Sequence, residues 1–386
     1  MKNNFDYIIV GCGFAGSIAA RKLAEEGDQK VLIIDKRGHL GGNAYDFVDE
    51  AGVLIHKYGP HIFHTNKEKV FKYLSNFTQW YDYSHEVVGN IHGKYIPIPF
   101  NLNSLKLTYD ENKAERLKNK LIDVYGIDKK VSILELQSHK DEELIELGKY
   151  IYENVFLYYT MKQWGQSPKD IDKSVVARVP VHISYDNRYF QDKFQGVPID
   201  GYTKVFENLL NHPNITVKLN EDARNVLKLA KDEVYVYNQP FSGGVIYTGA
   251  IDELMECKYG RLPYRTLDFK FETHDVSWFQ PRGTVNYTVD QPYTRITEFK
   301  YLSGQELDGT TTIVKEYARQ YTGAENEIPY YAILNDENRK KYEEYRNDLR
   351  ELNNFYLLGR LAEYKYYNMD EIVDRALELA EKILSN

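Results

Sequence analysis

Hydrophobic residues form two short runs at the start of the chain, separated by a glycine turn and an amphipathic segment. Residues 5–10 (Phe-Asp-Tyr-Ile-Ile-Val) and 31–35 (Val-Leu-Ile-Ile-Asp) are almost continuously apolar, as expected of strands that are covered on both faces. Between them, apolar residues follow helical spacing and stop at Gly27. The first forty residues therefore predict a strand, a turn, a helix and a second strand.

Amphipathic segments predict helices further along the chain. Apolar residues recur at helical spacing in residues 111–125 and 141–159, and a shorter pattern marks a helix at residues 70–77. In residues 141–159 the predicted inward positions are Leu144, Leu147, Ile151, Val155 and Tyr158. We interpret residues 100–163 as a mostly helical insert.

Alternation of polar and apolar residues predicts strands in residues 178–200 and 264–320. Three short apolar strands lie between these regions and predict a return to the first domain, at residues 215–219, 234–237 and 244–249. An apolar strand at residues 355–359 and a helix at residues 370–384 complete that domain.

Length and charge limit the class of protein. At about 150 residues per domain, 386 residues allow two or three domains. The chain has 49 basic and 57 acidic residues, and its net charge is −8. It therefore lacks the overall excess of basic residues expected of a general nucleic-acid-binding protein. Two cysteines exclude a disulfide scaffold and suit a reducing cytoplasm. The longest weakly polar stretch, residues 8–20, is too short to span a membrane, so we expect a cytoplasmic protein without membrane insertion.

Tyrosine is unusually frequent in this chain. The 34 tyrosines outnumber the 3 tryptophans and 17 phenylalanines together. Because tyrosine combines an apolar ring with a polar tip, the excess fits a deep, partly polar pocket. A codon bias of the genome is the alternative explanation.

The glycines of the first turn indicate a dinucleotide site. Gly11 allows the tight turn, Gly13 lets the backbone approach a pyrophosphate, and Gly16 lets the helix pack closely on the strand. The helix that begins near Phe14 directs its positive end at the phosphates. Asp35 ends the second strand about 20 residues later, where it can accept hydrogen bonds from ribose hydroxyls.

A second glycine turn favours FAD over NAD. Residues 40–44 (Leu-Gly-Gly-Asn-Ala) follow Asp35 closely, so the chain can fold back beneath the same pyrophosphate; a simple loop is the alternative. The strand ends at residues 247–250 and 357–360 add support, because the second one leads into a helix near Asp370. The N-terminus of that helix can face the electron-rich edge of a flavin. We therefore predict FAD.

The patterns divide the chain into three predicted domains, and the predicted fold class is α/β. A discontinuous Rossmann-like FAD-binding domain comprises residues 1–78, about 201–260 and 340–386. A helical insert domain covers about residues 79–164. An antiparallel β-sheet domain covers about residues 178–200 and 264–335.

Two arginines can hold an anionic ligand. Arg178 follows a stretch rich in Gly, Pro and Asp (residues 165–173), where a charged group can close over phosphates. Arg295 lies in a strand-like alternation. Guanidinium groups match diphosphate geometry better than lysine does, although a single arginine is more often a solvated surface charge. Aromatic residues that can add stacking faces and hydroxyls are Tyr159, Trp164, Tyr185, Tyr189, Tyr330, Tyr331 and Tyr366.

Neither a metal site nor a protein nucleophile is predicted. His61 and His64 have helical spacing, but the preceding Gly-Pro opposes a helix and no carboxylate or cysteine completes a ligand set. No Ser, Cys or Lys lies in a nucleophile motif such as GxSxG, and Cys12 is enclosed by the glycine turn. Covalent chemistry must therefore come from the cofactor.

Several longer motifs resemble those of bacterial UDP-galactopyranose mutases and together cover essentially the whole chain. They lie at residues 59–65 (GPHIFHT), 159–165 (YTMKQWG), 194–196 (FQG), 259–269 (YGRLPYRTLDF), 292–298 (PYTRITE) and 359–361 (GRL). The resemblance implies a flavoenzyme that interconverts UDP-galactopyranose and UDP-galactofuranose without net redox change, for use in cell-surface glycans. It also implies that the flavin is active when reduced and that its N5 bonds the anomeric carbon as UDP departs.

The same resemblance assigns roles to residues of this sequence. Arg178 and Arg295 would hold the diphosphate and stabilise the leaving group, and His61 would set the electronics of the flavin. The implied cofactor-binding residues are Gly11, Gly13, Phe14, Ala15, Gly16, Asp35, Lys36, Gly42, Asn43, His61, Ile62, Val217, Gly249, Arg360, Asn368, Met369 and Asp370. The implied substrate-binding residues are His85, Val155, Phe156, Tyr159, Thr160, Trp164, Arg178, Tyr185, Tyr189, Asn286, Arg295, Tyr331 and Tyr366.

Three positions depart from the usual family pattern. Asn368 stands in place of an acid, His85 in place of an asparagine and Val155 in place of a phenylalanine. The amide at Asn368 removes a charge that could tune the flavin or a nearby histidine, and the departures at His85 and Val155 leave open whether UDP-N-acetylgalactosamine is also accepted. We expect an electron donor and a second copy of the chain as partners. The alternative functions are an amine-oxidase-like flavin oxidoreductase, which shares the N-terminal core, and a nucleotide-sugar binding protein without turnover.

Overall fold

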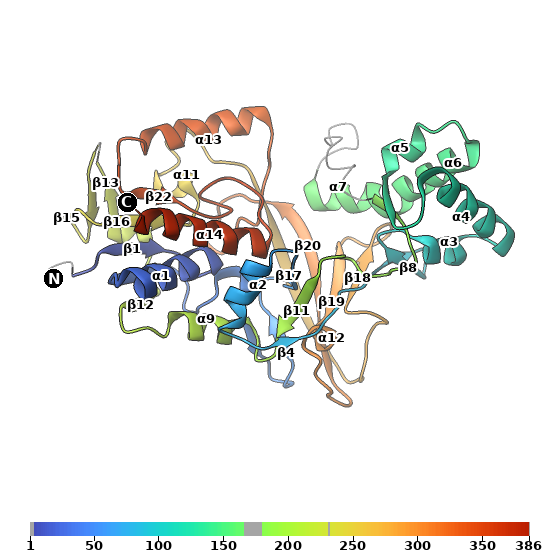
Figure 1. The fold of residues 1–386 in the computed structure, drawn as a ribbon, viewed down its shortest axis with the longest axis horizontal. Coiled ribbons are helices and arrows are strands. Elements are labelled where there is room, and N and C mark those ends of the chain that lie inside the picture. Colours follow the sequence, from blue (N-terminus) through green and yellow to red (C-terminus); the bar gives the residue numbers. More distant parts are fainter. Residues whose placement is uncertain (1–3, 166–179, 231, 386) are drawn as a thin grey trace.

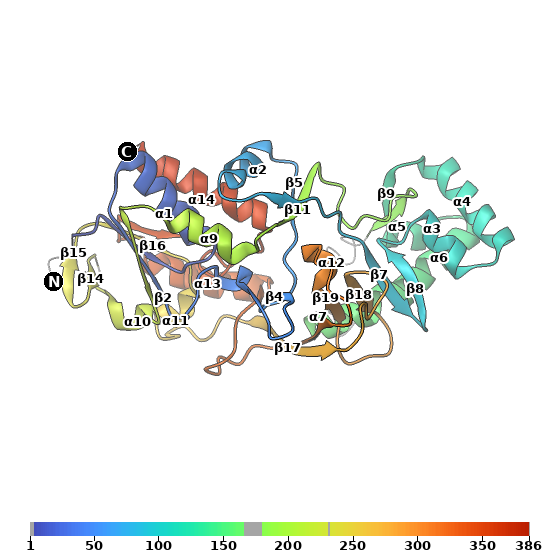
Figure 2. The same cartoon turned by 90° about the horizontal axis from the view of Figure 1, so that it is seen from below.

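The computed structural model describes residues 4–165, 180–230 and 232–385 of the chain. The molecule is elongated, with both chain termini beside a parallel sheet at one end (Figure 1). A cluster of helices forms the opposite end, and a second, larger sheet lies between them (Figures 1 and 2).

A five-stranded parallel sheet forms the first part. Its strands, in spatial order, are β12 (Ile215–Leu219), β2 (Val31–Asp35), β1 (Tyr7–Val10), β16 (Gly244–Tyr247) and β22 (Phe355–Leu357). All four pairings are parallel. This arrangement confirms the predicted strands at both ends of the chain and explains their continuously apolar sequences.

Helices cover both faces of the parallel sheet. On one face, Ile9, Ile33 and Ile246 share a core with α1 (Phe14–Gly27), α9 (Tyr202–Leu210) and α14 (Met369–Leu384). On the other face, Ile8 and Val245 pack with residues of α10 (Ala223–Val226), α11 (Ile251–Leu254) and α13 (Asp336–Asp348). Helices α1 and α14 lie side by side in both views (Figures 1 and 2).

Smaller elements surround this sheet. They are η1, a 3-10 helix (Gly42–Ala44), β3 (Asp46–Val48), β4 (Leu54–His56), β5 (Phe63–Thr65), α2 (Glu68–Ser75), β6 (Trp80–Tyr81), β11 (Phe194–Pro198), β13 (Leu227–Leu229), β14 (Val234–Val236) and β15 (Gln239–Phe241). Strand β14 was predicted to return to the first domain, but it pairs only with β13 and β15 in a separate three-stranded sheet of the described residues. A local sequence pattern predicts that a segment forms a strand, but it does not indicate which strand it pairs with.

The second sheet has seven strands. Their spatial order is β21 (Tyr331–Ala332), β17 (Tyr264–His274), β20 (Thr311–Gln320), β19 (Arg295–Glu298), β18 (Thr284–Tyr287), β7 (Val87–Ile91) and β8 (Lys94–Ile98). The pairings are antiparallel except for the parallel pair β18 and β7. Helix α12 (Phe299–Ser303) follows β19 directly.

Strands β7 and β8 lie in the range 79–164, which was expected to be helical. Both are rich in β-branched residues, and His92 and Gly93 between them have positive φ angles of 51° and 83°. Two consecutive positive φ angles are typical of a tight two-residue hairpin turn. The hairpin therefore extends the large sheet, while its buried side chains pack against the helices.

The helical cluster shares a hydrophobic core with strands β7 and β8. Its elements are α3 (Leu102–Thr108), α4 (Glu111–Tyr125), β9 (Lys129–Ser132), α5 (Ile133–Gln137), α6 (Glu142–Ile151), η2, a π-helix (Tyr152–Leu157), α7 (Tyr158–Trp164) and β10 (Pro180–Ile183). Strand β10 was expected in the antiparallel sheet domain, but it pairs with β9, while β11 pairs with β5 and β6. The division into three domains stays a prediction.

The π-helix shifts the register of the long helical segment. Tyr158 was predicted to face inward, but it is 46% exposed, whereas Thr160 and Gln163 are 4% and 8% exposed. A π-helical turn contains an extra residue, and one residue corresponds to about 100° around a helix. The prediction for Tyr158 was therefore wrong, and Tyr159 turns toward the large sheet instead.

Candidate functional site

A cavity of about 270 Å³ opens at the carboxyl ends of four parallel strands. Strands β1, β2, β16 and β22 end at this edge, where Gly11, Asp35, Thr248 and Gly359 line the cavity. Open α/β sheets bind their ligands at this edge. The predicted cofactor residues that line it are Gly11, Gly13, Phe14, Ala15, Asp35, Lys36, Gly42, Asn43, His61, Gly249, Arg360, Asn368 and Met369.

Two glycines of the first turn serve different purposes. A Cβ on Gly16 would lie 2.0 Å from the carbonyl oxygen of Gly11, so Gly16 is required for helix–strand packing. A Cβ on Gly13 would have only ordinary contacts, the nearest at 3.6 Å from Gly42, and its φ of −86° suits any residue. The fold itself does not require a glycine at position 13. The open space beside it fits a ligand that approaches the backbone.

The N-terminus of α1 lies directly after Gly13, and the two together form a cradle for a ligand. Gly13 provides no side-chain cap, and the first turn has no acidic residue. The first N–H groups of a helix need partners and favour an anion. These features fit the pyrophosphate of a dinucleotide.

Asp35 links the first glycine turn to the segment that follows β2. Its carboxylate accepts hydrogen bonds from the backbone N–H groups of Cys12 (2.8 Å) and Arg37 (2.9 Å). Burial and the charge of Asp35 raise the pKa of the Cys12 thiol to about 12. The thiol therefore stays protonated at neutral pH and does not act as a nucleophile.

Four predicted cofactor residues do not line this cavity. Gly16 acts through packing, Ile62 lines a second cavity, and the Asp370 carboxylate accepts a 2.8 Å hydrogen bond from Thr65. Val217 lies within β12 and contributes to neither cavity. Residues that the sequence analysis did not foresee line the first cavity instead, among them Arg37, Asp222, Ala223, Arg224, Glu253 and Glu327. Their positions depend on loops brought together only by the fold.

A second cavity, also of about 270 Å³, adjoins the first. Asn43, His61, Arg360, Asn368 and Met369 line both. The predicted residues that line the second cavity are His61, Ile62, His85, Tyr159, Tyr189, Asn286, Arg295, Tyr331 and Tyr366. It also includes Tyr58, His64, Val87, Thr284, Glu316 and Tyr330, of which only Tyr330 was a candidate from the sequence.

Arg295 lies at the centre of the polar wall of this second cavity. Its Nη2 donates a 3.0 Å hydrogen bond to the hydroxyl of Tyr159, and its Nε lies 3.4 Å from a carboxylate oxygen of Glu316. Burial opposes the charge on Arg295, but Glu316 and the nearby tyrosine oxygens raise its pKa above the ordinary value. Burial also raises the pKa of the Tyr159 hydroxyl, which therefore remains a hydrogen-bond donor.

Buried polar atoms in the cavity wall lack hydrogen-bond partners within the described chain. They are Oγ1 of Thr284, Oδ1 of Asn286, Oε1 of Glu316 and Nε of Arg295, the last of which lies beside the other oxygen of Glu316. Buried polar groups in proteins are nearly always hydrogen-bonded. The acceptor oxygens of Asn286 and Glu316 and the hydroxyl of Thr284 in one wall therefore suit a ligand with several hydroxyl groups.

The half-buried His61 and the buried His85 of the wall are neutral. The Nδ1 of His61 lies 2.8 Å from the carbonyl of Gly59, so Nδ1 carries the proton and Nε2 can accept. The backbone N–H of His61 donates to Nδ1 of His56 at 3.0 Å. Burial, reinforced by His56, lowers the pKa of His61 to about 3, and burial with Arg295 does the same for His85.

Some predicted substrate residues lie elsewhere. Val155 and Phe156 are buried in the core of the helical cluster, Thr160 is buried in α7 outside the cavity wall, and Tyr185 is 48% exposed. Arg178 and the side chain of Trp164 lie outside the described residues. The assignments of Arg178 and Trp164 therefore stay predictions.

His64 contacts neighbouring side chains of the protein. Its Nδ1 lies 2.9 Å from Asp192 and its ring stacks on Phe190. Across residues 4–165, 180–230 and 232–385, no group of three or more His, Cys, Asp or Glu side chains can hold a metal ion. No helix in these same ranges is long and apolar enough to cross a membrane.

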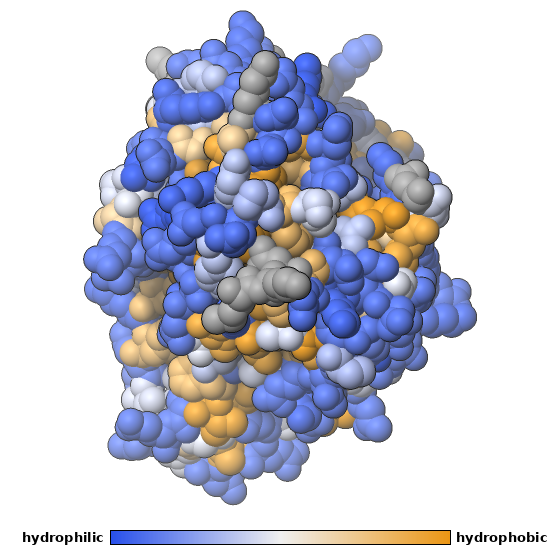
Figure 3. Space-filling view, turned by 90° about the vertical axis from the view of Figure 1, so that its left-hand side faces the viewer, coloured by the Kyte–Doolittle hydropathy of each residue, from blue (hydrophilic) through white to orange (hydrophobic). Residues whose placement is uncertain are grey.

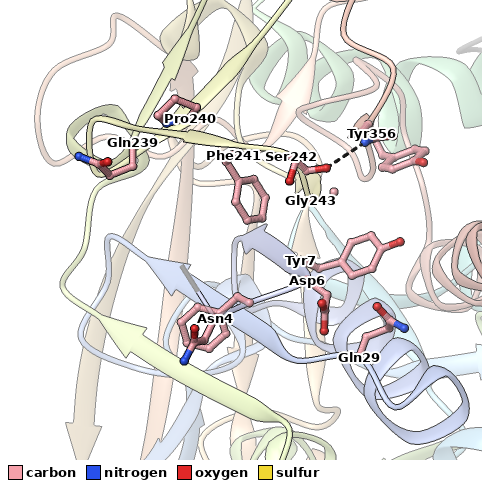
Figure 4. Close-up of a pocket in the computed structure, with 13 residues that line it drawn as sticks. Asn4, Asp6, Tyr7, Gln29, Gln239, Pro240, Phe241, Ser242, Gly243 and Tyr356 are labelled. Carbon is pink, nitrogen blue, oxygen red and sulfur yellow. Dashed lines mark hydrogen bonds between the residues drawn. The ribbon is translucent and has the colours of Figure 1, made fainter. Parts of the chain in front are cut away.

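A third cavity, of about 710 Å³, lies at the opposite edge of the parallel sheet (Figure 4). Its lining includes Asp6 and Tyr7 at the start of β1 and Tyr356 of β22. The Asp6 carboxylate already accepts from the N–H of Lys30 at 2.8 Å. The surface at this end is mostly hydrophilic, with apolar residues in small groups (Figure 3). The amino ends of parallel strands are not where α/β sheets bind nucleotides, so we assign the site to the first two cavities.

Comparison with known proteins identifies the family. A family model described as UDP-galactopyranose mutase matches residues 154–366, and a model of an NAD(P)-binding Rossmann-like domain matches residues 9–77. The chain is 38% identical over 386 residues to the probable UDP-galactopyranose mutase of Klebsiella pneumoniae, covering 100% of this chain and 96% of the relative. The chain belongs to the UDP-galactopyranose mutase family. It is therefore an isomerase of this type, and the predicted resemblance is confirmed.

Other relatives extend the comparison. The chain is 38% identical over 382 residues to the dTDP-fucopyranose mutase of Escherichia coli, covering 98% of each protein. A crystal structure of reduced UDP-galactopyranose mutase matches with a TM-score of 0.70 at 15% identity, covering 99% of this chain and 94% of that one. A putrescine oxidase structure matches with a TM-score of 0.55 at 13% identity, so it shares the fold alone. The predicted α/β fold with a Rossmann-like domain is confirmed.

Proposed function

We propose that this chain interconverts UDP-galactopyranose and UDP-galactofuranose, with FAD in the first cavity and the nucleotide sugar in the second. The observation that carries the proposal is the shared wall formed by Asn43, His61, Arg360, Asn368 and Met369. A cofactor that reaches this wall presents its reactive end to the sugar. The family assignment supports the same reaction.

The residues of the first cavity fit FAD. The cradle at Gly13 and the N-terminus of α1 would hold the pyrophosphate, and Asp35 would accept from the ribose. The N-terminus of α14 at Met369 would face the isoalloxazine. Bound there, a reduced flavin would supply the electron-rich centre for the bond to the sugar, which agrees with the absence of a nucleophile motif.

Arg295 has the clearest role among the described residues. Its permanent charge, together with that of Arg178, would hold the diphosphate and stabilise UDP as it leaves. The hydroxyls of Tyr159, Tyr189 and Tyr331 stay protonated because burial raises their pKa values, so each can donate to a phosphate oxygen. These groups bind charge that develops when the bond to the sugar breaks.

The remaining polar atoms of the wall would orient the sugar. Hydroxyl groups of a hexose can donate to Asn286 and Glu316, which otherwise lack partners for one oxygen each within the described chain. The neutral His61 would accept through Nε2 at the side where the two cavities meet. Ring opening and reclosure require the sugar hydroxyls to be held while the anomeric carbon reacts.

A second substrate has a specific observation in its favour. The dTDP-fucopyranose mutase of Escherichia coli is as similar to this chain, at 38% identity, as the probable UDP-galactopyranose mutase. A dTDP-linked 6-deoxyhexose is therefore the alternative substrate. We further propose that the protein works in the cytoplasm as a homodimer, takes electrons from a separate donor and supplies galactofuranose for cell-surface glycans.

Product analysis tests the function directly. The holoenzyme is incubated with UDP-galactofuranose, or with dTDP-fucofuranose, with and without dithionite, and the products are separated by chromatography. We expect UDP-galactopyranose to form only with the reductant and faster than dTDP-fucopyranose. Equal conversion without the reductant, when the flavin is oxidised, would contradict the proposal. Consumption of one equivalent of an electron acceptor for each sugar converted would also contradict it.

A further inference from the structure

Lys162 of α7 uses its ammonium group to bind a turn of the large sheet. Its Nζ donates to the backbone carbonyls of Tyr287, Gln291 and Tyr293, at 2.5, 2.9 and 3.3 Å. An ammonium group has three N–H donors, so this arrangement uses all of them. The side chain acts as a tie between two elements that are more than a hundred residues apart.

This tie joins the two elements that supply the centre of the site. Tyr287 is the last residue of β18, Gln291 and Tyr293 lie in the connection from β18 to β19, and β19 begins at Arg295. On α7, Tyr159 precedes Lys162 by three residues, so both side chains lie on the same face of the helix. The hydrogen bond from Arg295 to Tyr159 therefore joins the same two elements from inside the cavity.

A second contact holds the end of α7. Arg265 of β17 donates to the backbone carbonyls of Gln163 (2.9 Å) and Lys162 (3.1 Å). A cation at the C-terminus of a helix is favoured by the helix dipole. Gly165 follows with a φ of +64°, and a Cβ there would lie 2.5 Å from Nη1 of Arg265. The last turn of α7 is thus fixed on the large sheet.

The register of α7 needs such support because a π-helix precedes it. The extra residue in η2 turns Tyr159 toward Arg295 and leaves Tyr158 exposed. A shift of one residue would exchange these two side chains. Lys162 lines neither of the two cavities, so its contribution to the site acts through α7.

We propose that Lys162 is a positioning residue for the mutase reaction, which holds Tyr159 against Arg295 by tying α7 to the β18–β19 connection. The inference rests on the proposed function for its substrate. It does not require Lys162 to touch the nucleotide sugar or the cofactor.

A double-mutant cycle of Lys162→Met and Tyr159→Phe tests the inference. Turnover of UDP-galactofuranose by the reduced holoenzyme and calorimetric affinity for UDP are both measured, with flavin content as a check on folding. Lys149→Met is the matched control, because Lys149 is an exposed lysine of α6 in the same helical segment. We expect K162M to lower kcat/KM and UDP affinity by about tenfold, the scale of a lost hydrogen bond to a charged group, while K149M changes neither.

The cycle separates positioning from a general structural role. If Lys162 acts through Tyr159, K162M causes less than about a twofold further loss in the Y159F background. Losses that multiply in the double variant, or a K162M variant that behaves like K149M, would overturn the inference. If K162M does not fold, Lys162→Gln, which keeps two donors, replaces it in the same cycle.

The two measurements distinguish this inference from the proposed function. A wild-type protein that binds UDP but converts no UDP-galactofuranose would refute the proposed function, while the cycle in UDP affinity would still decide the role of Lys162. A wild-type protein that binds no UDP would overturn both.

Discussion

Arg295 and Glu316 face each other in the register of β19 and β20, and the Arg295 Nε lies 3.4 Å from the Glu316 carboxylate. Burial raises the pKa of Glu316, whereas the guanidinium opposes this shift and favours the carboxylate. The pair places a fixed positive charge beside Tyr159, in the wall of the second cavity. We attribute the orientation of Arg295 toward the second cavity to this partner.

Glu316→Gln removes the charge and keeps the shape of the side chain. We expect kcat/KM for UDP-galactofuranose to fall at least about tenfold and the protein to lose about 3 kcal/mol of stability, because a buried guanidinium then lacks its counter-charge. Steady-state kinetics and denaturant unfolding measure the two effects. Glu272→Gln is the control, since Glu272 pairs with Lys315 at a more exposed position. Equal behaviour of the two variants would contradict the role of Glu316.

Gly13→Ala and Gly16→Ala are expected to differ. Gly13 has room for a methyl group as long as no ligand is bound, so G13A should lose at most about 1 kcal/mol of folding stability. The same methyl group would occupy the space of the ligand, so G13A should retain little FAD. Gly16 has a backbone oxygen 2.0 Å from the position of its Cβ, so G16A loses ~1–3 kcal/mol or more without any ligand. Flavin absorbance and thermal unfolding of the apoprotein distinguish the variants. Full FAD retention by G13A would show that the cradle lies elsewhere.

Asn286→Ala tests which part of the ligand the cavity wall contacts. Asn286 has a buried oxygen without a partner in the described chain, which we assign to a sugar hydroxyl. Loss of one such contact costs ~1–3 kcal/mol, so kcat/KM falls about tenfold or more. Affinity for UDP, which has no hexose, should change less than twofold in calorimetry. An equal loss of UDP affinity would place the nucleotide at Asn286 instead.

Activity is expected to decline as the pH rises through about 8. Burial lowers the pKa of Lys162 from 10.5 to about 8, and the charge of Asp290 on the β18–β19 connection opposes this shift. Arg265 of β17 donates to the backbone carbonyls of Lys162 and Gln163. Deprotonation leaves two donors for three carbonyls and loosens α7. The alkaline limb of the kcat/KM profile should disappear in K162M.

Unfolding caused by this group cannot produce the same decline. The folded-state pKa lies below the value of 10.5, so between about pH 8 and 10.5 the unfolded chain binds more protons than the folded chain. The contribution of Lys162 to stability therefore rises with pH in this window. An unchanged alkaline limb in K162M would assign the titration to another group.

Much of the first cavity could be predicted from the sequence, because its residues follow strands whose apolar runs are easy to recognise. Gly11, Asp35 and Gly249 come directly from this pattern, and all three line the cavity. Val217 lines neither cavity, and its assignment to the cofactor stays a prediction. Asp222 and Arg224 line the first cavity from a segment with no motif of its own, so no local feature of the sequence indicated them.

The second cavity was harder to predict because it forms between distant elements. In the sequence, Glu316 is one residue of an alternating strand pattern. Only the pairing of β19 with β20 places it against Arg295. Hydrophobic spacing predicted an uninterrupted helix through Tyr158, but the π-helix changed the register by one residue. A periodic pattern cannot reveal such an insertion, because Val155 and Phe156 are both apolar and both buried.

The central claim is that the cofactor, and no side chain, bonds the sugar, while Arg295 and its partners release UDP. Borohydride added to the reduced holoenzyme during turnover of radiolabelled UDP-galactose, followed by denaturation and mass spectrometry of both fractions, tests this claim most directly. We predict that the hexose is recovered on the flavin and that the polypeptide has its unmodified mass. A hexose attached to an amino acid residue of the polypeptide would contradict the account.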